Sequence, residues 1–405
     1  MTPQLILFDD ARAADWQPFT LTRPAGELLF GAHTMRARAE LVFGVPAVGH
    51  LAEGLEGFSE PDAAPVIDPS RVAADAPRIL LLSRAVPAFQ QPPAWPQHTT
   101  RITIDGRTVG WYLPAGAPLP DPESLRAVDT QQGDALAIEG RVLENVWELI
   151  IGNAGQVAVD AEAARMRGAA IGSLPAHVQL IGRAEDVIIG DDATIEPGVV
   201  FDTSHGPIWL DDGVTVRAYT RLAGPSYVGR GSTILGGSVG EVSIGPVCKV
   251  HGEVEASVVL GYANKAHDGF LGHAYLGRWV NLGALTTNSD LKNNYGNIRL
   301  WTPRGDVDTG QMKLGCLLGD HVKTGIGTML NTGTVVGTGA NLYGAAMPPK
   351  YVPPFSWGSG SDLGEYDLDR FLATAERVMR RRGLQLEPGV RALLTRVHER
   401  SRRAR

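Results

Sequence analysis

The 405-residue chain contains only two cysteines, Cys248 and Cys316, and no long apolar segment. Two cysteines cannot build a disulfide framework, so we expect a reducing, cytoplasmic environment. No apolar run approaches the roughly 18 residues of a transmembrane helix. Residues 1–4 also lack the basic segment and apolar stretch of a signal peptide. These absences exclude secreted, membrane-spanning and disulfide-stapled classes of protein.

Composition predicts a folded protein of two or three domains, since hydrophobic residues make up 43% of the chain and charged residues 20%. The net charge of −7 conceals a basic C-terminus, because residues 376–405 hold ten arginines and three glutamates. Apolar pairs at residues 371–372, 378–379 and 393–394 recur there at helical spacing. We therefore expect two amphipathic helices and no nucleic-acid binding, since no recognition motif accompanies the charge.

Residues 181–350 contain 29 of the 49 glycines and repeat with a period of six. A period of six matches neither a helix nor an ordinary strand. It predicts short strands separated by turns, with a small apolar residue pointing inward and Gly or Asn taking the turn. Three such units close a triangular coil, which indicates a parallel β-helix rather than a sandwich without a fixed phase. The repeat is clearest at Leu318, Thr324, Leu330, Val336 and Leu342.

These hexads resemble the left-handed β-helix of the bacterial hexapeptide-repeat acyltransferases. The resemblance implies a homotrimer that binds acyl-coenzyme A between neighbouring prisms. The repeat is interrupted at residues 264–297, and this segment resembles one particular family among these acyltransferases. The order and spacing of its residues are similar to the acetyltransferase half of the bifunctional N-acetylglucosamine-1-phosphate uridylyltransferase/glucosamine-1-phosphate N-acetyltransferase family. The matching elements are Lys265-Ala266, His267, Phe270, Leu271-Gly272, the VNLGA run at 280–284 and Asn294-Tyr295.

The resemblance implies transfer of an acetyl group from acetyl-CoA to a sugar amine. The amine must lose a proton as it attacks the thioester, and an imidazole of ordinary pKa, about 6.5, can take that proton. We predict that His267 is the general base. Asn281, Asn294 and Tyr295 carry groups suited to orienting a sugar phosphate. By resemblance, the backbone near Ala284 is the oxyanion donor.

Two positions depart from that family. Phe270 stands where the family has a tyrosine, and residues 255–257 (EAS) replace an upstream lysine. Arg217 and Arg221 lie nearby, and we favour Arg221 as the ligand of the sugar's phosphate. These departures put the identity of the acceptor sugar in question more than the acyl-transfer chemistry.

Four histidines on the repeat, His251, His267, His273 and His321, raise a zinc site as an alternative. His267 and His273 are six residues apart and therefore project from different faces. His251 and His267 could stack on adjacent coils, but they would still need a neighbour's ligand. We therefore expect no zinc.

The hexad phase is lost over residues 286–311, which are rich in Asn, Asp, Gly and Thr. Such a long excursion is usually functional or disordered. Because it carries Asn294-Tyr295, we predict an arm that reaches an active site, its own or a neighbour's. Disorder in the absence of ligand is the alternative.

Residues 1–175 combine short buried-strand patterns at 5–8 and 78–82 with helical spacing over 141–167, which predicts an α/β domain. Residues 18–35 (PFTLTRPAGELLFGAHTM) resemble the segment that follows the phosphate loop of sugar-1-phosphate nucleotidyltransferases. The resemblance implies a reaction with UTP and Mg²⁺.

Two departures from that second family affect phosphate binding. Residues 8–12 (FDDAR) replace its glycine-rich loop, and Ala25 replaces the lysine after Arg23. We predict that Arg12 and Arg23 bind phosphate and that Asp9 or Asp10 holds Mg²⁺. In the alternative interpretation, residues 9–10 simply end a strand and Arg23 is a surface charge.

The predicted architecture is an α/β nucleotidyltransferase-like (Rossmann-like) domain over 1–175, a left-handed parallel β-helix over 176–352 and an arginine-rich helical tail over 353–405. The predicted function is N-acetylation of glucosamine 1-phosphate from acetyl-CoA, followed by uridylyl transfer from UTP to N-acetylglucosamine 1-phosphate. Alternatives are an enzyme for another (deoxy)amino sugar phosphate, or a head that only senses sugar nucleotide. Each coil of a repeat contacts only its neighbours, so we also expect the β-helix to assemble without the head.

Overall fold

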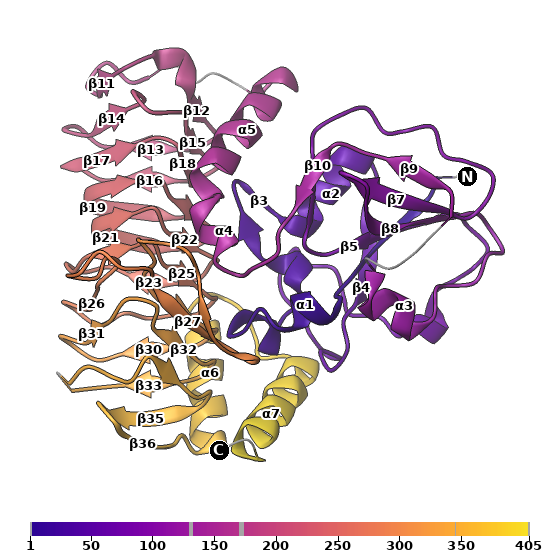
Figure 1. Cartoon of the computed structure of the whole chain (residues 1–405). Coiled ribbons are helices and arrows are strands. Elements are labelled where there is room, and N and C mark those ends of the chain that lie inside the picture. The colour runs from indigo at the N-terminus through magenta and orange to yellow at the C-terminus, as the bar shows by residue number, and fades with distance from the viewer. Residues whose placement is uncertain (1, 129–132, 170–173, 345, 404–405) are drawn as a thin grey trace.

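The computed structural model describes residues 2–128, 133–169, 174–344 and 346–403. It consists of a head, a three-sided β-helix and a helical tail (Figure 1). The head lies against one side of the β-helix, and the tail lies at the C-terminal end of the β-helix, next to the head. Within the described ranges, no helix is both long and apolar enough to cross a membrane.

The head is built on a six-stranded sheet of order β4-β1-β5-β8-β7-β9. Strand β1 is the apolar run predicted at residues 5–8, and it pairs in parallel with β4 and β5 on either side. Helix α2 begins where the Thr34 hydroxyl accepts a hydrogen bond from Ala37 N, and it ends at Gly44 in the left-handed conformation. The strands are β1 (Gln4–Phe8), β4 (Ala47–Leu51), β5 (Arg78–Leu82), β7 (Thr100–Ile104), β8 (Arg107–Leu113) and β9 (Ala135–Ala137), and the helices are α1 (Ala11–Ala14), α2 (Met35–Phe43) and α3 (Pro122–Arg126).

Two short strand pairs complete the head, and two helices lead from it to the β-helix. The predicted helix over 141–167 is present but starts later, after strand β10, and breaks at Gly152. The elements are β2 (Leu29–Phe30), β3 (His33–Thr34), β6 (Ala85–Pro87), β10 (Gly140–Val142), α4 (Glu148–Ile151) and α5 (Asn153–Met166).

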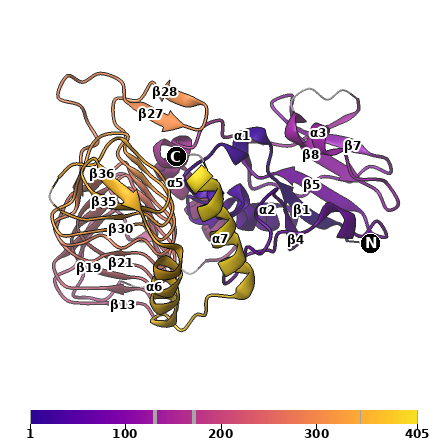
Figure 2. The same ribbon diagram turned by 90° about the horizontal axis from the view of Figure 1, so that it is seen from below.

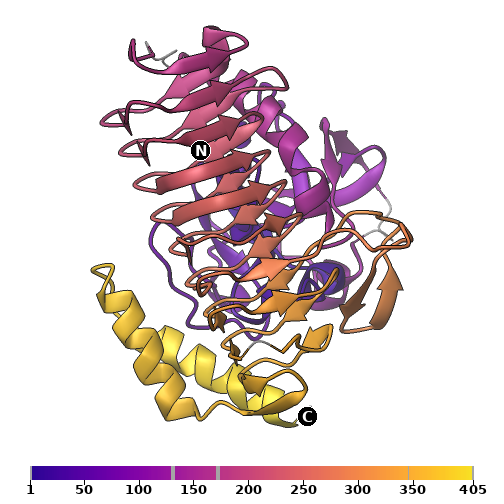
Figure 3. The same ribbon diagram turned by 90° about the vertical axis from the view of Figure 1, so that its left-hand side faces the viewer.

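The left-handed parallel β-helix has three faces, and β19 and β21 bend from one to the next. Figure 3 shows the stacked strands on the side away from the head. Face 1 contains β11 (Gln179–Ile181), β14 (Val200–Asp202), β17 (Thr220–Ala223), the ends of β19 (Thr233–Gly240) and β21 (Lys249–Glu255), β24 (Leu271–Gly272), β26 (Thr287–Asn288) and β31 (Met329–Leu330). Face 2 contains β12 (Val187–Ile189), β15 (Ile208–Leu210), β18 (Ser226–Val228), β20 (Ser243–Ile244), β22 (Val258–Val259), β25 (Tyr275–Leu276), β29 (Leu317–Leu318), β32 (Val335–Val336) and β34 (Tyr351–Val352). Face 3 contains β13 (Thr194–Ile195), β16 (Thr215–Val216), the starts of β19 and β21, β23 (Asn264–Lys265), β30 (Lys323–Thr324), β33 (Asn341–Leu342) and β35 (Ser356–Ser359), which pairs with β36 (Asp362–Glu365).

The six-residue period describes the core of this β-helix correctly. The predicted inward positions are buried, among them Leu318, Leu330 and Leu342, with exposures of at most 2%. Successive coils stack in register, so that Tyr275 pairs with Leu317 and Leu317 with Val335 on face 2. The fold-class prediction is therefore confirmed for the head, the β-helix and the helical tail.

The predicted arm contains a hairpin of β27 (Arg299–Thr302) and β28 (Gly305–Asp308), which projects from the β-helix beside α1 (Figure 2). Arg304 forms a salt bridge with Asp15 at 2.9 Å, and Trp301 stacks on Tyr351 with ring centroids 3.6 Å apart. The arm of this chain is thus fastened to its own head.

The tail consists of α6 (Leu368–Arg380) and α7 (Pro388–Arg403). Asp367 caps α6 by accepting from Arg370 N at 2.9 Å. The apolar faces of both helices pack into one cluster with the β-helix and the head, through Phe371 and Leu394 on the helices, Phe355 on the β-helix and Phe58 on the head. The prediction of an amphipathic pair is confirmed.

Face 2 of the β-helix is covered by the head. Phe19 and Phe30 of the head pack in one apolar cluster with Tyr275, Leu317 and Val335 of face 2. The Tyr275 hydroxyl donates to the Leu29 carbonyl at 3.1 Å and accepts from the Leu29 amide at 2.9 Å. The head and the β-helix therefore share a core, which the expectation of an independent β-helix did not include.

Candidate functional site

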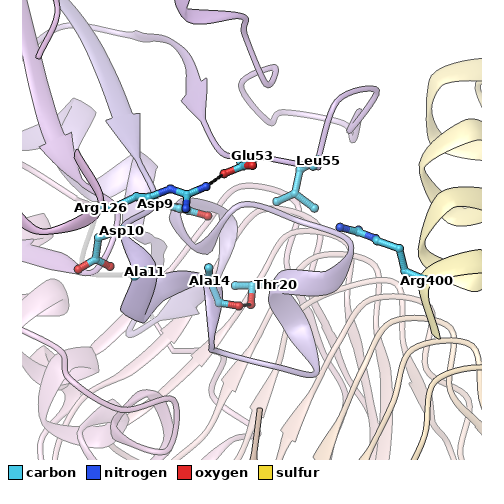
Figure 4. A pocket seen from close by; sticks show the side chains of 10 residues that line it. Asp9, Asp10, Ala11, Ala14, Thr20, Glu53, Leu55, Arg126 and Arg400 are labelled. Carbon is cyan, nitrogen blue, oxygen red and sulfur yellow. Dashed lines mark hydrogen bonds and ion pairs between the residues drawn. The ribbon is translucent and has the colours of Figure 1, made fainter. Parts of the chain in front are cut away.

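The head has an open pocket of about 400 Å³ at the carboxyl end of β1 (Figure 4). Ligands of open α/β sheets bind outside the carboxyl ends of parallel strands, so the position is typical of a substrate site. The walls come from the turn into α1, the loop after β4, the end of α3 and, unexpectedly, α7. The polar and charged lining residues are Asp9, Asp10, Thr20, Glu53, Arg126 and Arg400.

Asp10 has structural partners on both carboxylate oxygens. Its Oδ1 caps α1 by accepting from Ala13 N at 2.8 Å, and its Oδ2 lies 2.7 Å from a terminal nitrogen of Arg84. Because both oxygens are occupied, the structure does not favour Asp10 as the magnesium ligand.

Asp9 fits a divalent cation better. Its Oδ2 accepts from Ala25 N at 3.1 Å, whereas its Oδ1 is shielded from solvent and accepts no hydrogen bond of normal geometry. Burial raises the pKa of Asp9 above its ordinary value, against the lowering effect of Ser83 and Ala25. A bound cation would offset that burial, and Mg²⁺ needs only one or two protein carboxylates when phosphates supply other ligands.

The two arginines predicted to bind phosphate are both engaged elsewhere. Arg12 is 40% exposed on α1 and forms an ion pair with Glu144. Arg23 is 1% exposed, and its guanidinium lies 2.7 Å from Glu60 and 2.7 Å from Asp320, which belongs to the β-helix. Arg23 is neither the predicted nucleotide ligand nor the alternative surface charge. It joins the head to the β-helix.

On the β-helix, the predicted base and the predicted oxyanion donor lie at one corner, between faces 3 and 1. His267 is exposed there, and its ring forms no hydrogen bond within the described chain. The next coil stacks on it through Leu285 N, which donates to the Asp268 carbonyl at 3.0 Å. The neighbouring Ala284 N–H has no acceptor among the described residues, while its carbonyl accepts from Gly327 N at 2.8 Å. A free amide and a free imidazole on adjacent coils are the kinds of group that acyl transfer uses as oxyanion donor and base.

Lys265 supports this corner from inside the coil. It occupies an inward hexad position and is 2% exposed. Its ammonium donates to the carbonyls of His251, at 2.8 Å, and His267. Burial lowers the pKa of Lys265 to about 8. The lysine of the KA motif therefore fixes the backbone below the base rather than facing the substrate.

Sequence reasoning missed two acidic residues at the same corner. Asp268 Oδ1 lies 3.0 Å from Nε2 of His251, one coil away from His267. Glu253 is exposed on face 1, in the register row that leads to Phe270. The six-residue period of the sequence could have placed Glu253 in the same row as Phe270. It could not have shown the contact between Asp268 and His251, because that contact depends on how neighbouring coils stack.

Arg221 stands too far along face 1 to share this corner within one chain. The register row runs from Arg221 through Ser238 and Glu253 to Phe270. Three strand spacings of about 4.8 Å separate Arg221 from Phe270 by roughly 14 Å. Arg221 instead pairs with Asp202 on the coil before it. The structure does not bring Arg221 to His267.

Asn281 lines a second pocket, of about 420 Å³, between face 3 and the end of α6. Its Oδ1 accepts from Asn264 Nδ2 at 3.0 Å. Four cations surround the two amides, with no carboxylate among the lining residues: Lys249, Lys323, Arg381 and Arg382. Burial lowers the pKa of Lys323 to about 8. These cations could bind a phosphate. On each coil of this face, the residue just before the inward-pointing position lines the pocket: Lys249, Asn264, Asn281 and Lys323.

The remaining predicted residues lie on the arm or around it. Asn294 closes a turn by accepting from Gly296 N at 3.1 Å, and Tyr295 is 66% exposed. No hydrogen bond joins either residue to His267. Phe270 is half-buried, with its ring against Gly272. Over the described residues, no group of three or more His, Cys, Asp or Glu side chains is arranged to hold a metal ion.

Several known proteins are similar to parts of this chain. A family model described as sugar nucleotidyl transferase matches residues 5–167. The chain is 28% identical over 95 residues to a bifunctional sugar-1-phosphate nucleotidylyltransferase/acetyltransferase of Sulfurisphaera tokodaii, covering 24% of each chain. It is 28% identical over 174 residues to the bifunctional protein GlmU of Synechococcus elongatus, covering 42% of this chain and 33% of that protein. A UDP-N-acetylglucosamine acyltransferase structure from Arabidopsis matches 53% of this chain and 78% of its own, at 13% identity and a TM-score of 0.27.

The fold and the family match describe a β-helix protein whose head, at residues 5–167, matches a sugar nucleotidyl transferase family model. Segments of the chain are similar to bifunctional sugar-1-phosphate nucleotidylyltransferase/acetyltransferases, in agreement with the resemblance of its motifs. The matched segments span 24% and 33% of those relatives' lengths, so the relatives' substrates are not thereby the substrates of this chain.

Proposed function

We propose that this chain is a cytoplasmic bifunctional enzyme, which acetylates glucosamine 1-phosphate on the β-helix and transfers uridylyl from UTP to the product on the head. The observation that carries the proposal is the corner where the unpartnered His267 ring and the free Ala284 amide lie on adjacent coils. Acyl transfer needs both groups, a base for the amine and a donor for the oxyanion.

In the acyl transfer, the neutral sugar amine attacks the thioester carbonyl of acetyl-CoA. A C–N bond forms, and His267 accepts the amine's proton. The carbonyl oxygen gains negative charge, which the Ala284 N–H stabilises by a hydrogen bond. The C–S bond then breaks, and the thiolate leaves with a proton as coenzyme A. The products are the N-acetyl sugar phosphate and free coenzyme A.

The sugar's phosphate would bind in the pocket beside Asn281. Lys249, Lys323, Arg381 and Arg382 supply positive charge there, and Asn281 supplies an amide for the sugar's hydroxyls. This assignment replaces Arg221 as the phosphate ligand.

We expect a homotrimer, in which a second copy covers the His267 corner. Two large apolar side chains are exposed on the coils that follow His267 at this corner: Leu285 and Ile326, at 58% and 74%. Leu285 directly follows Ala284, so a neighbour that covers it also closes the site. In such a trimer, Asn294 and Tyr295 would serve a neighbouring subunit.

The head pocket supports nucleotidyl transfer. The sugar's phosphate oxygen attacks the α-phosphorus of the nucleoside triphosphate, and pyrophosphate leaves. Asp9 would hold Mg²⁺, which neutralises phosphate charge when bound. Neither a membrane nor a nucleic acid is expected as a partner.

The acyl transfer is tested by replacing His267→Ala and measuring coenzyme A release with glucosamine 1-phosphate and acetyl-CoA. Loss of a general base costs about 10²–10⁴-fold in rate. His205→Ala is the matched control, because His205 is another exposed histidine of the β-helix. Near-normal turnover of His267→Ala at pH 7 would show that His267 is not the base.

The nucleotidyl transfer is tested by mixing the protein with UTP, Mg²⁺ and N-acetylglucosamine 1-phosphate and assaying pyrophosphate. We expect release that depends on all three additions. Release only with another nucleotide or another (deoxy)amino sugar phosphate would redefine the substrates. Binding of sugar nucleotide without pyrophosphate release would support a head that only senses it.

A further inference from the structure

An arginine of the C-terminal helix reaches the pocket of the head, almost the whole length of the chain away in sequence. Arg400 on α7 lines the same pocket as Asp9, and its side chain projects from α7 toward the head (Figure 4). A Cβ placed on Gly54, in the loop after β4, would lie 3.0 Å from a terminal nitrogen of Arg400. The guanidinium therefore rests directly on the loop that forms one wall of the pocket.

Helix α7 holds this position through packing on both sides. Leu393, Leu394 and Val397 lie in one apolar cluster with Leu55 and Phe58 of the head. One turn before Arg400, Arg396 donates to the carbonyl of Glu56 in the same loop. Residues four apart share a helix face, so the anchor at 396 aims Arg400 at the pocket.

The charges of the pocket leave Arg400 without an anionic partner. Asp10 is paired with Arg84, and Glu53 with Arg126. Among the described residues, no carboxylate lies within salt-bridge distance of Arg400. The exposed guanidinium of Arg400 therefore lines the same pocket as Asp9, whose buried Oδ1 accepts no hydrogen bond. A bound polyphosphate would pair with the guanidinium, and its cation would bind beside the carboxylate of Asp9.

We propose that Arg400 binds the phosphates of the nucleoside triphosphate used by the head, so that the C-terminal helix completes the nucleotide site in cis. The inference rests on the proposed nucleotidyl transfer and names a residue outside the family match, which ends at residue 167. It also accounts for how the head replaces the glycine-rich loop that it lacks. A guanidinium binds phosphate through paired, charge-assisted hydrogen bonds.

Calorimetry with UTP and Mg²⁺ tests this on the full-length protein. Arg400→Ala should weaken binding by about 10- to 150-fold, the range for one lost hydrogen-bonding contact to a charged group. Arg400→Lys should fall between, because it keeps the charge and loses the paired geometry. Arg403→Ala, an exposed arginine one turn further on α7, is the matched control and should bind normally. Acyl transfer should be unchanged in all three variants.

The possible failures are distinguishable. If the wild type binds UTP and Arg400→Ala binds it equally well, Arg400 is not a phosphate ligand, while the proposed function of the head stands. If the wild type binds neither UTP nor pyrophosphate with Mg²⁺, the proposed function of the head fails and this inference fails with it. If Arg403→Ala loses as much affinity for UTP as Arg400→Ala, the loss comes from the overall positive charge of the tail. That result would overturn the assignment of Arg400 as a phosphate ligand.

Discussion

Buried arginines connect parts of the chain that are far apart in sequence. Arg38 of α2 is 0% exposed and lies 2.7 Å from Asp160 of α5 through a terminal nitrogen. Arg23 makes a similar connection between Glu60 of the head and Asp320 of the β-helix. A buried guanidinium needs such partners, since an unpaired buried charge is costly. The role of these arginines is structural, and their positions in the sequence do not indicate it.

Arg23→Ala should destabilise the protein. The variant leaves Glu60 and Asp320 without their shared cation, and removing one partner of a buried ion pair costs about 3–5 kcal/mol. Urea denaturation followed by tryptophan fluorescence measures the free energy of unfolding. Arg12→Ala is the control, since its partly exposed pair with Glu144 is worth only about 0–1 kcal/mol. A stable Arg23→Ala protein with weakened UTP binding would restore the phosphate-binding role.

At the scale of elements, one corner of the β-helix departs from the expected turn chemistry. Glycine or asparagine was expected wherever φ is positive, yet Tyr262, Trp279, His321 and Phe355 have φ of 53°, 65°, 62° and 54°. Each such residue costs of order 1–3 kcal/mol unless its surroundings compensate. Here the rings form a column, with Tyr262 and Trp279 centroids 4.5 Å apart, on which Phe371 of α6 packs. The strained turns thus provide the surface that receives the tail.

The arm is the element whose role changed most. The sequence predicted a segment that carries Asn294 and Tyr295 to an active site. In the structure its hairpin, β27–β28, is joined to the head by Arg304 and Asp15. The fastened hairpin leaves the turn with Tyr295 exposed, so delivery to a neighbouring subunit stays a prediction.

At the scale of the whole molecule, the head and the β-helix form one packed unit. An isolated β-helix would expose Tyr275, Leu317 and Val335, which are buried under the head. Contacts between neighbouring coils alone predict that the β-helix assembles without the head, but face 2 adds a large apolar contact with the head. Without the head, the β-helix should therefore be poorly soluble.

Acidification should weaken this unit. Burial lowers the pKa of His321 to about 3 and that of His33 to about 4, from an ordinary value of 6.5. Both rings are neutral in the fold, so below pH 6.5 the unfolded chain binds more protons. Stability is therefore complete above pH 6.5 and falls as the pH drops toward these values. Each histidine can contribute up to about 1.4 kcal/mol per pH unit.

Melting temperatures between pH 7.5 and 5 measure this effect. The wild type should lose stability as the pH falls, and His321→Gln should lose less over the same interval. His205→Gln, at an exposed position, should behave as the wild type. An identical pH slope in His321→Gln and the wild type would exclude His321 as a cause.

The sequence by itself determined the β-helix, the α/β head and the amphipathic tail, and it predicted His267 as the base. Those features follow from local rules. A six-residue period determines where strands and turns fall, and a motif of fixed spacing determines which residues lie at one corner of one coil. It also predicted a phosphate site in the head, but with Arg12 and Arg23 as ligands.

Only the tertiary structure decided which arginines line an open pocket and which pair with a carboxylate. Arg23 is occupied because Asp320, 297 residues away, reaches it, and Arg400 enters the head pocket because α7 packs beside Leu55. The free Ala284 amide likewise depends on how adjacent coils stack. A guanidinium or an amide has the same chemistry wherever it stands in the chain, and its role is set by the partner that folding brings within about 3 Å.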